Sequence, residues 1–167
     1  MKRLLSLLLL VVALPLGSVR AQNDAPVKIL VFPLKNLYGE VKYDSLAWTY
    51  ADSLVSYLNH RPNASASYAI VSMDDIRDQM IALNIDVRAP SYETDIWKIA
   101  KALGAKKIIW GTYLVKYEKA NLEIKIIDVK TLMPDRVNIA DKLRVGYPDA
   151  LSTVVAAGDK LVPGLKP

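Results

Sequence analysis

The chain of 167 residues contains no cysteine, one histidine and one phenylalanine. Without cysteine it forms no disulfide, thiolate metal site or cysteine nucleophile, and we expect no lipid anchor of the bacterial lipoprotein kind. The single histidine, His60, falls at the end of a predicted helix with no acid or nucleophile placed beside it. We expect it to cap that helix, where a cation interacts well with the dipole. These absences predict no catalytic site, no metal and no cofactor, and therefore not an enzyme.

The chain also carries little net charge beyond its first 21 residues. The net charge of the full sequence is +5, but residues 1–21 contribute three basic residues and no acid, which leaves +2 for the rest of the chain. Nucleic-acid binding usually needs a basic patch or stripe, so we expect no nucleic acid among the partners.

The first 21 residues have the pattern of a secretory signal peptide. Lys2 and Arg3 precede an apolar run over residues 4–14, and small side chains surround a cleavage position between Ala21 and Gln22. The apolar run is too short to span a bilayer of roughly 30 Å as a stable helix. We therefore predict cleavage and a periplasmic or secreted protein; an uncleaved amino-terminal anchor is the alternative. Residues 22–167 fit one domain.

The remaining chain alternates strand and helix patterns and then changes to consecutive strands. The predicted order is β-α-β-α-α-β-β-β-α. Alternation in the first half favours parallel pairing, and the second half favours an antiparallel meander. The sequence thus predicts an α/β fold of α+β character: a five-stranded mixed sheet with helices packed on it. The predicted strands are 27–32, 68–72, 105–118, 121–129 and 136–145, and the predicted helices are 44–60, 72–84, 91–104 and 147–162.

Several end signals support these boundaries. Ser72 and Asp75 have capping-box spacing, and Gly104 stands where a helix end favours a left-handed residue. Asp44 or Ser45 is expected to cap the first helix.

Side-chain periodicity predicts which residues of the last two elements face inward. In the last strand they are Val137, Ile139, Leu143 and Val145. In the last helix they are Leu151, Val154, Val155, Leu161 and Val162.

The order of three short motifs resembles the amino-terminal domain family of TolB, with related domains in CsgG-, LpoB- and FlgO-type envelope proteins. A strand ends in a Pro-containing turn, a helix ends in Leu-Gly before a strand with a central glycine, and a later strand ends in Asp followed by Thr. The matching residues are Phe32, Pro33, Asn36, Leu103, Gly104, Gly111, Asp128 and Thr131. Leu132 replaces the glycine that the family has in the last turn.

The resemblance covers most of residues 27–162. It implies a non-catalytic module that binds envelope proteins, without the TolB propeller. Because the only obvious hairpins are short, the long membrane-spanning hairpins of CsgG-type channels are not expected.

Binding is best placed in the loop 33–43, because ligands of α/β sheets tend to lie beyond the carboxyl ends of parallel strands. Pro33 should end the first strand, since it cannot donate to a ladder. The loop carries the candidate interaction residues Lys35, Asn36 and Tyr38. The Asn36 side chain either binds a partner or bonds its own loop backbone, and both readings stand.

Tyr113 and Tyr117 share parity along one predicted strand. They form either packing beneath a helix or an aromatic contact patch, and both tyrosines are candidate interaction residues.

Two functions remain. The first is a periplasmic protein-interaction or assembly module whose partners are envelope proteins, with self-association through a sheet edge as a further hypothesis. The second is a small exported ligand-binding protein or enzyme that uses the loop after the first strand. A deep polar cleft beside Asn36 that contains Asp44 and a basic residue would favour the second function. A flat or oligomer-forming edge would favour the first.

Overall fold

The structure, a computed structural model, describes residues 26–166. The predicted signal segment and its cleavage position at Ala21 and Gln22 lie outside the described residues. The strands are β1 (Val27–Val31), β2 (Lys35–Asn36), β3 (Tyr68–Ile70), β4 (Lys107–Lys116), β5 (Lys119–Asp128) and β6 (Pro134–Gly146). The α-helices are α1 (Ser45–Asn59), α2 (Ala64–Ser67), α3 (Met73–Ala82), α4 (Tyr92–Ala102) and α5 (Val154–Leu161). The 3-10 helices are η1 (Val41–Tyr43), η2 (Tyr147–Thr153) and η3 (Val162–Leu165).

The strands form one mixed sheet in the order β3-β1-β4-β5-β6. β1 pairs in parallel with β3 and with β4, whereas β4, β5 and β6 pair antiparallel. This confirms the mixed sheet, its parallel first half and its antiparallel meander.

The predicted count of five strands and the predicted element order are wrong in detail. The described residues form a sixth strand, β2, which pairs in parallel with β4 through Lys35–Thr112 and Asn36–Tyr113. Pro33 has no N–H to donate, so it interrupts the pairing that β1 begins, and the chain rejoins β4 two residues later. The short helix α2 also lies in residues 61–67, between the predicted first helix and the predicted second strand, where no element was predicted.

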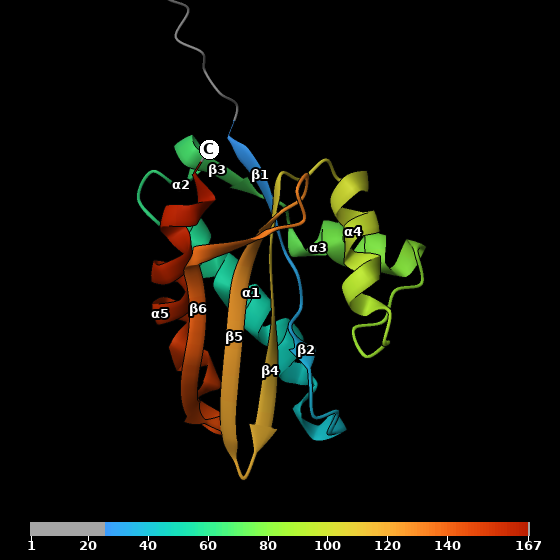
Figure 1. Ribbon diagram of the computed structural model, residues 1–167, viewed down its shortest axis with the longest axis vertical. Helices are drawn as coiled ribbons and strands as arrows, with labels where there is room; N and C mark the ends of the chain where they lie inside the picture. Colours follow the sequence, from blue (N-terminus) through green and yellow to red (C-terminus); the bar gives the residue numbers. More distant parts are fainter. Residues whose placement is uncertain (1–25, 167) are drawn as a thin grey trace, which may run out of the picture.

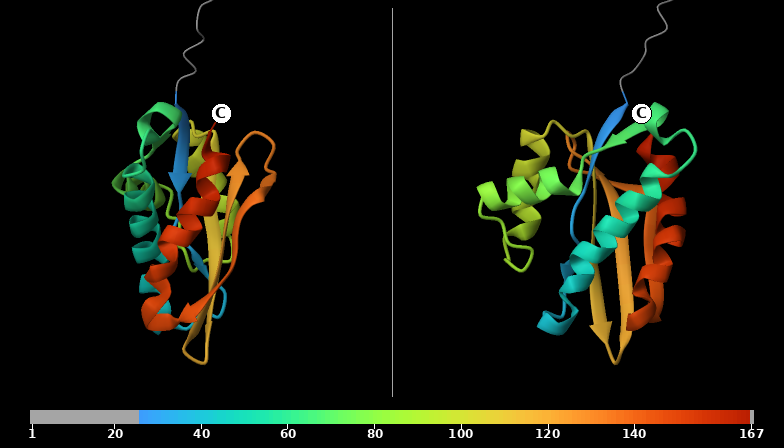
Figure 2. Two further views of the ribbon diagram at one scale, coloured as in Figure 1. Left: turned by 90° about the vertical axis from the view of Figure 1, so that its left-hand side faces the viewer. Right: turned by 180° about the vertical axis from the view of Figure 1, so that it is seen from behind.

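Among the described helices, α1 and α5 cover one face of the meander. On the other face Ile108 and Trp110 of β4 are still buried, whereas the hairpin half, with Lys116 and Glu123, is exposed. Figure 1 shows β4, β5 and β6 in front with α1 and α5 behind them, and α3 and α4 beside β1. From behind, α1 crosses the strands diagonally next to α5 (Figure 2). The core lies between these helices and the sheet, where Tyr113, Leu122, Ile124 and Ala140 are buried.

Buried tyrosines fix the chain where regular pairing stops. The Tyr92 hydroxyl donates to the carbonyl of Pro33 at 2.8 Å, and the Tyr113 hydroxyl donates to the carbonyl of Tyr43 at 2.9 Å. Burial raises the pKa of both phenols, most strongly that of Tyr92. Because both hydroxyls have acceptors, these large side chains fill the core without leaving a donor unsatisfied.

The predicted end signals are mostly confirmed. The Asp75 N–H donates to Ser72 Oγ at 3.1 Å, and Gly104 has a φ of +65°. His60 ends α1, with its Nδ1 2.7 Å from the carbonyl oxygen of Ser56. The expected cap by Asp44 or Ser45 is wrong: Asp44 occupies the N-cap position without a capping hydrogen bond from its side chain, and Ser45 is already the first residue of the helix.

The inward-facing set of β6 is partly wrong, because Val137 is 88% exposed. The Asp135 carboxylate accepts the N–H groups of Val137 and Asn138, which turns the backbone locally. Register shifts against β5 and a positive φ at Lys142 mark bulges that change the parity along the strand.

In the last helical segment, Val154 and Leu161 are buried as predicted, but Leu151 and Val155 are exposed. The segment begins as the 3-10 helix η2 and continues as α5. A 3-10 helix has three residues per turn, so Leu151 of η2, which was inferred from an α-helical period of 3.6, faces outward.

Candidate functional site

Asn36 organises the loop that follows β2. Its Oδ1 accepts the backbone N–H groups of Tyr38 and Gly39 at 3.2 and 3.1 Å. Its Nδ2 donates to the carbonyl of Glu40 at 3.1 Å and to Asp44 Oδ1 at 3.0 Å. The sequence left open whether the Asn36 side chain binds a partner or its own loop. In the structure it binds its own loop, and these bonds use both N–H donors and the oxygen acceptor of the amide.

Asp44 links this loop to the segment between α3 and α4. Arg88 Nη2 lies 2.5 Å from Asp44 Oδ2 in an ion pair, although no hydrogen-bond donor within the described residues is aligned with that buried oxygen. One oxygen of the Asp44 carboxylate thus accepts a hydrogen bond from the Asn36 amide, and the other lies beside the positive charge of Arg88. Its negative charge also contributes to the raised pKa of the buried Tyr113 phenol, after the larger effect of burial.

These residues line a cavity of about 490 Å³, which we call the Asn36 cleft. Its polar members include Asn36, Asp44 and Arg88, and its apolar walls include Leu34, Val41, Ala47, Trp48, Val87 and Tyr113. The cleft therefore contains Asp44 and a basic residue beside Asn36, the arrangement that the sequence analysis named as favouring a ligand site. Asp44 and Arg88 are already paired with each other, and a second acid of the cleft, Asp86, accepts the backbone N–H of Arg88 at 2.9 Å.

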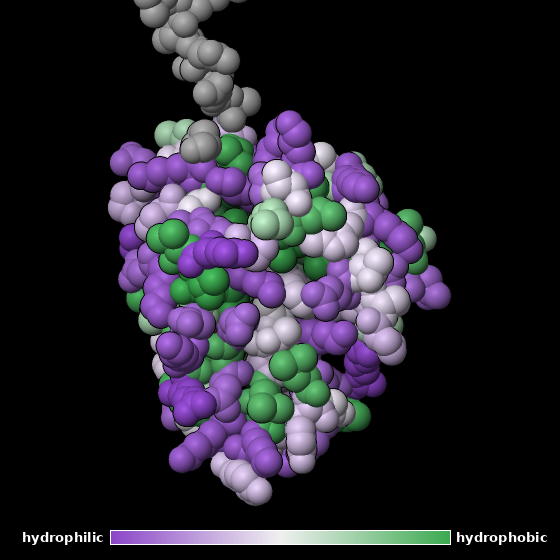
Figure 3. All heavy atoms as spheres, in the orientation of Figure 1, coloured by the Kyte–Doolittle hydropathy of each residue, from purple (hydrophilic) through white to green (hydrophobic). Residues whose placement is uncertain are grey.

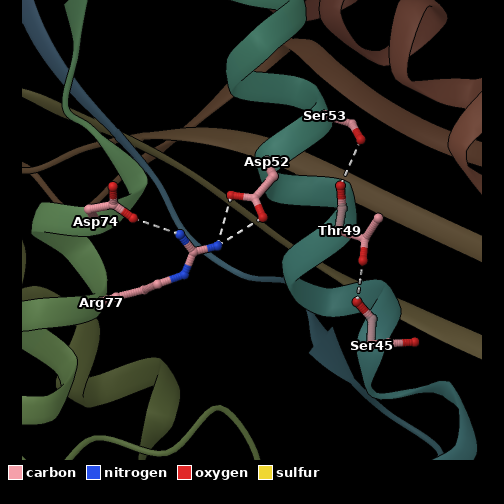
Figure 4. A network of polar contacts seen from close by, with 6 residues as sticks. All are labelled: Ser45, Thr49, Asp52, Ser53, Asp74 and Arg77. Atoms are coloured by element: carbon pink, nitrogen blue, oxygen red, sulfur yellow. Dashed lines mark hydrogen bonds and ion pairs between the residues drawn. The ribbon is translucent and has the colours of Figure 1, made fainter.

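A second ion-pair cluster lies farther along α1, on the other side of Trp48. Figure 4 shows Arg77 of α3 between two carboxylates: Nη2 donates to Asp52 at 2.8 Å, and Nη1 donates to Asp74 at 3.0 Å. The guanidinium carbon is 4.8 Å from the centre of the Trp48 ring. The two arginine pairs and the indole between them hold α1 against the α3–α4 region, next to a cavity of about 580 Å³.

The two candidate tyrosines of the hairpin do not come together. Tyr113 is fully buried beneath the helices, whereas Tyr117 is 86% exposed. Tyr117 and Glu118 both have positive φ and form the two-residue turn between β4 and β5, so Tyr117 lies outside the strand on which its parity was predicted. The two tyrosines therefore do not form a shared aromatic patch. Tyr113 packs in the core beneath the helices, which is the alternative that the sequence left open.

Exposed apolar side chains gather at the hairpin end of the molecule. We call Leu37, Tyr38, Val41 and Tyr117 the loop–hairpin surface; each is more than half exposed. The loop and the hairpin are tied together, because the Tyr43 hydroxyl donates to Glu118 Oε1 at 3.0 Å. Both segments lie at the lower end of the sheet in Figure 1.

The last predicted candidate, Lys35, is half-buried in β2 opposite Thr112. Consecutive residues of a strand point to opposite faces, so Lys35 faces away from the side that carries Asn36. Arg88 and Trp48 were missed. Neither belongs to a motif, and the pairing of Arg88 with Asp44 depends on the way the α3–α4 loop folds back onto α1.

Within residues 26–166 no group of three or more histidine, cysteine or acidic side chains is placed to hold a metal ion. Among the helices described, none combines the length and the apolar character that crossing a bilayer would require.

The sequence matches no protein-family model and no curated protein. Among solved structures, the lipoprotein GNA1162 from Neisseria meningitidis is similar, with 16% identity over 83% of this chain and 97% of that chain and a TM-score of 0.56. LpoB from Escherichia coli, solved by NMR, has 15% identity over 73% of this chain and 58% of that chain and a TM-score of 0.54. The chain shares the fold of these two envelope proteins, and identities this low establish the fold alone.

The similarity to TolB from Acinetobacter baumannii covers 86% of this chain and 29% of that chain at 13% identity, with a TM-score of 0.49. The specific likeness to the TolB amino-terminal domain therefore stays a prediction. The LpoB-type relation named alongside it agrees with the shared fold.

Proposed function

We propose that this protein is a non-catalytic, exported module that binds another protein of the cell envelope through the loop–hairpin surface. One observation carries the proposal. The polar groups beyond β2 are engaged with one another, whereas the apolar residues around them are exposed. The site therefore offers a shaped contact surface rather than a free nucleophile or base.

The composition of this surface supports protein binding. Large exposed apolar residues that occur together, rather than singly, mark interaction sites, and tyrosine is enriched in protein interfaces. Four hydrogen bonds of the Asn36 amide hold the loop that carries Leu37, Tyr38 and Val41. A loop ordered before binding loses less conformational entropy when it binds.

Export is supported by the predicted signal segment and by the envelope proteins that share the fold. The absence of cysteine supports a protein held in the envelope by its partners rather than by a lipid of its own.

The Asn36 cleft supports a second candidate function, the binding of a small carboxylate-containing ligand. The specific observation is Arg88, whose side chain is 59% exposed although it is paired with Asp44. A ligand carboxylate would share this guanidinium with Asp44, since arginine can donate to two acceptors. An enzyme at this position would need a free acid or base, and the Asp44 carboxylate is held by Asn36 and Arg88.

The test is affinity capture from crosslinked envelope extract with the purified protein as bait. We expect a reproducible envelope protein whose recovery falls when Tyr38→Ala and Tyr117→Ala are combined. Val137→Ala is the matched control, because it removes an equally exposed side chain from the other end of the sheet. Equal capture by both variants would contradict the proposed surface. Loss on Arg88→Ala alone would move the site into the cleft.

A further inference from the structure

The face of the meander that no described helix covers carries a concentration of positive charge at its hairpin end. Antiparallel partners lie on the same face of a sheet, and Tyr113 and Leu122 belong to the covered face. The alternate residues Leu114, Lys116, Lys119 and Asn121 therefore project from the open face, as does Arg144, the partner of Asn121. Figure 3 shows this face, where hydrophilic residues dominate over β5 and β6 with hydrophobic ones between them.

Two of these cations oppose each other directly. Lys116 of β4 is the register partner of Lys119 of β5, immediately beside the Tyr117–Glu118 turn. Like charges directly across a ladder are destabilising, so this pair does not contribute to the stability of the hairpin. An oppositely charged residue at either position would be the more stable choice.

Within residues 26–166 no ion pair neutralises these cations. None of Lys116, Lys119 and Arg144 has an acidic partner within 4 Å among the residues described. The adjacent acid, Glu118, accepts the Tyr43 hydroxyl and lies 3.9 Å from Lys42 on the loop side. The next acid on the open face, Glu123, stands opposite Thr112, beyond the Leu114–Asn121 pair.

The three cations line a hollow of about 710 Å³ together with one acid, Glu118. The Glu118 carboxylate is already engaged, because it accepts the Tyr43 hydroxyl and lies near Lys42, so the cations outnumber the acid by three to one. Leu114 supplies apolar surface, and the exposed Tyr117 ring stands at the rim with Lys116 Nζ 5.2 Å from the ring centre. A concave surface fits a segment of chain, whereas a bilayer presents a broad, nearly flat surface that would not enter it. The hollow, its charge and its apolar floor thus fit an extended segment with carboxylates and at least one apolar side chain.

We propose that this hollow binds an acidic segment of the protein partner, with Lys116, Lys119 and Arg144 as the residues that receive its carboxylates. The inference rests on the proposed function and adds the chemistry of the partner. The hollow borders the loop–hairpin surface at Tyr117, so one partner can occupy both. Charge complementarity of this kind steers association and selects the partner more than it raises affinity.

The experiment measures the binding of a fluorescein-labelled peptide of eight glutamates to the purified protein by fluorescence anisotropy at low ionic strength. We expect binding that weakens as salt rises. Combined substitution K116A, K119A and R144A should lower the affinity at least tenfold. The control combination K101A, K130A and R136A removes the same charge from exposed positions away from the hollow and should change the affinity less than twofold.

A second variant separates binding from stability. Lys119→Glu replaces the opposing pair by an attractive one, so it should raise the melting temperature while it abolishes peptide binding. A rise in melting temperature with unchanged binding would overturn the proposal. An equal loss of peptide affinity in both triple variants would also overturn the proposal. The same holds if the wild type does not bind the peptide, or if it binds phosphatidylglycerol vesicles instead of the peptide.

The outcomes also separate this inference from the proposed function. The triple variant K116A, K119A and R144A is also used as bait in the envelope capture. If it still captures the envelope protein that the Tyr38→Ala, Tyr117→Ala variant loses, the inference of an acidic segment is wrong, but the proposed loop–hairpin surface is retained. If the peptide binds in the hollow but no envelope protein is captured, the hollow is an anion site and the proposed function is wrong.

Discussion

Replacing Asn36 by alanine tests whether this side chain is the organiser of the binding loop. The amide forms two hydrogen bonds to exposed N–H groups, which water can replace, and these contribute little to stability. Its bond to the Glu40 carbonyl contributes about 1 kcal/mol, and its bond to the Asp44 carboxylate contributes about 1.5 kcal/mol. We therefore expect Asn36→Ala to lower the free energy of unfolding by about 2.5 kcal/mol, which is roughly 7 °C in melting temperature for a domain of this size.

Urea denaturation followed by circular dichroism gives the loss of stability, and limited proteolysis reports on the loop. Cleavage near Tyr38 should accelerate, because the loop loses the bonds that fix it. Asn121→Ala is the matched control, since the Asn121 side chain forms no hydrogen bond within the described residues, and we expect a change within about 0.5 kcal/mol. A loss below about 0.5 kcal/mol for Asn36→Ala, with unchanged proteolysis, would refute the organising role.

Three further predictions concern the sheet and its turns. Leu132 is half-exposed and has a φ of +59°, a conformation that costs leucine more than glycine. Leu132→Gly should therefore stabilise the protein by about 1 kcal/mol, measured by urea denaturation. The control Leu83→Gly, at a helix end with negative φ, should not stabilise it. A Cβ on Gly111 would lie 2.1 Å from the carbonyl oxygen of Glu123, so Gly111→Ala should cost roughly 3 kcal/mol; a melting temperature equal to that of the wild type would contradict this close strand contact. Hydrogen bonds from Thr131, its backbone N–H first, lower the pKa of Asp128 in the folded state. The stability that this carboxylate contributes is therefore present above its unfolded pKa of about 3.9 and lost as the pH falls through the lower folded pKa. Asp128→Asn should thus be less stable than the wild type near pH 7, with a difference that shrinks near pH 2.

Local signals in the sequence were sufficient where one segment determines its own structure. The Ser72–Asp75 capping pair and the left-handed Gly104 depend only on neighbouring residues. Leu132 shows the same principle. The motif places a glycine there, and the leucine of this chain adopts the left-handed conformation that the turn requires.

Periodicity did not predict the places where the backbone departs from a regular repeat. The Asp135 side chain bonds the backbone at the start of β6 and so exposes Val137, although its parity matched the inward set. Likewise, β2 follows an interruption at Pro33 and is held by β4, far away in the chain.

The sequence singled out the loop of the candidate site but not the contacts within it. Asn36 and Asp44 were both singled out, yet the expected cap by Asp44 was replaced by its contacts with Asn36 and Arg88. Which partner a carboxylate takes depends on the tertiary position of the arginine, and no pattern in the sequence specifies that position. The buried Tyr113 and the exposed Tyr117 differ because the strand ends at Lys116, two residues before its predicted end, which places Tyr117 in the turn.

Site-specific photocrosslinking tests the central claim most directly. A photoreactive phenylalanine analogue placed at Tyr38, at Tyr117 or at the control position Val137 would be activated in intact cells. The account predicts a covalent adduct with the same envelope protein from positions 38 and 117, and no such adduct from position 137. Adducts from position 137 alone, or none from positions 38 and 117 while the protein remains folded, would contradict the account.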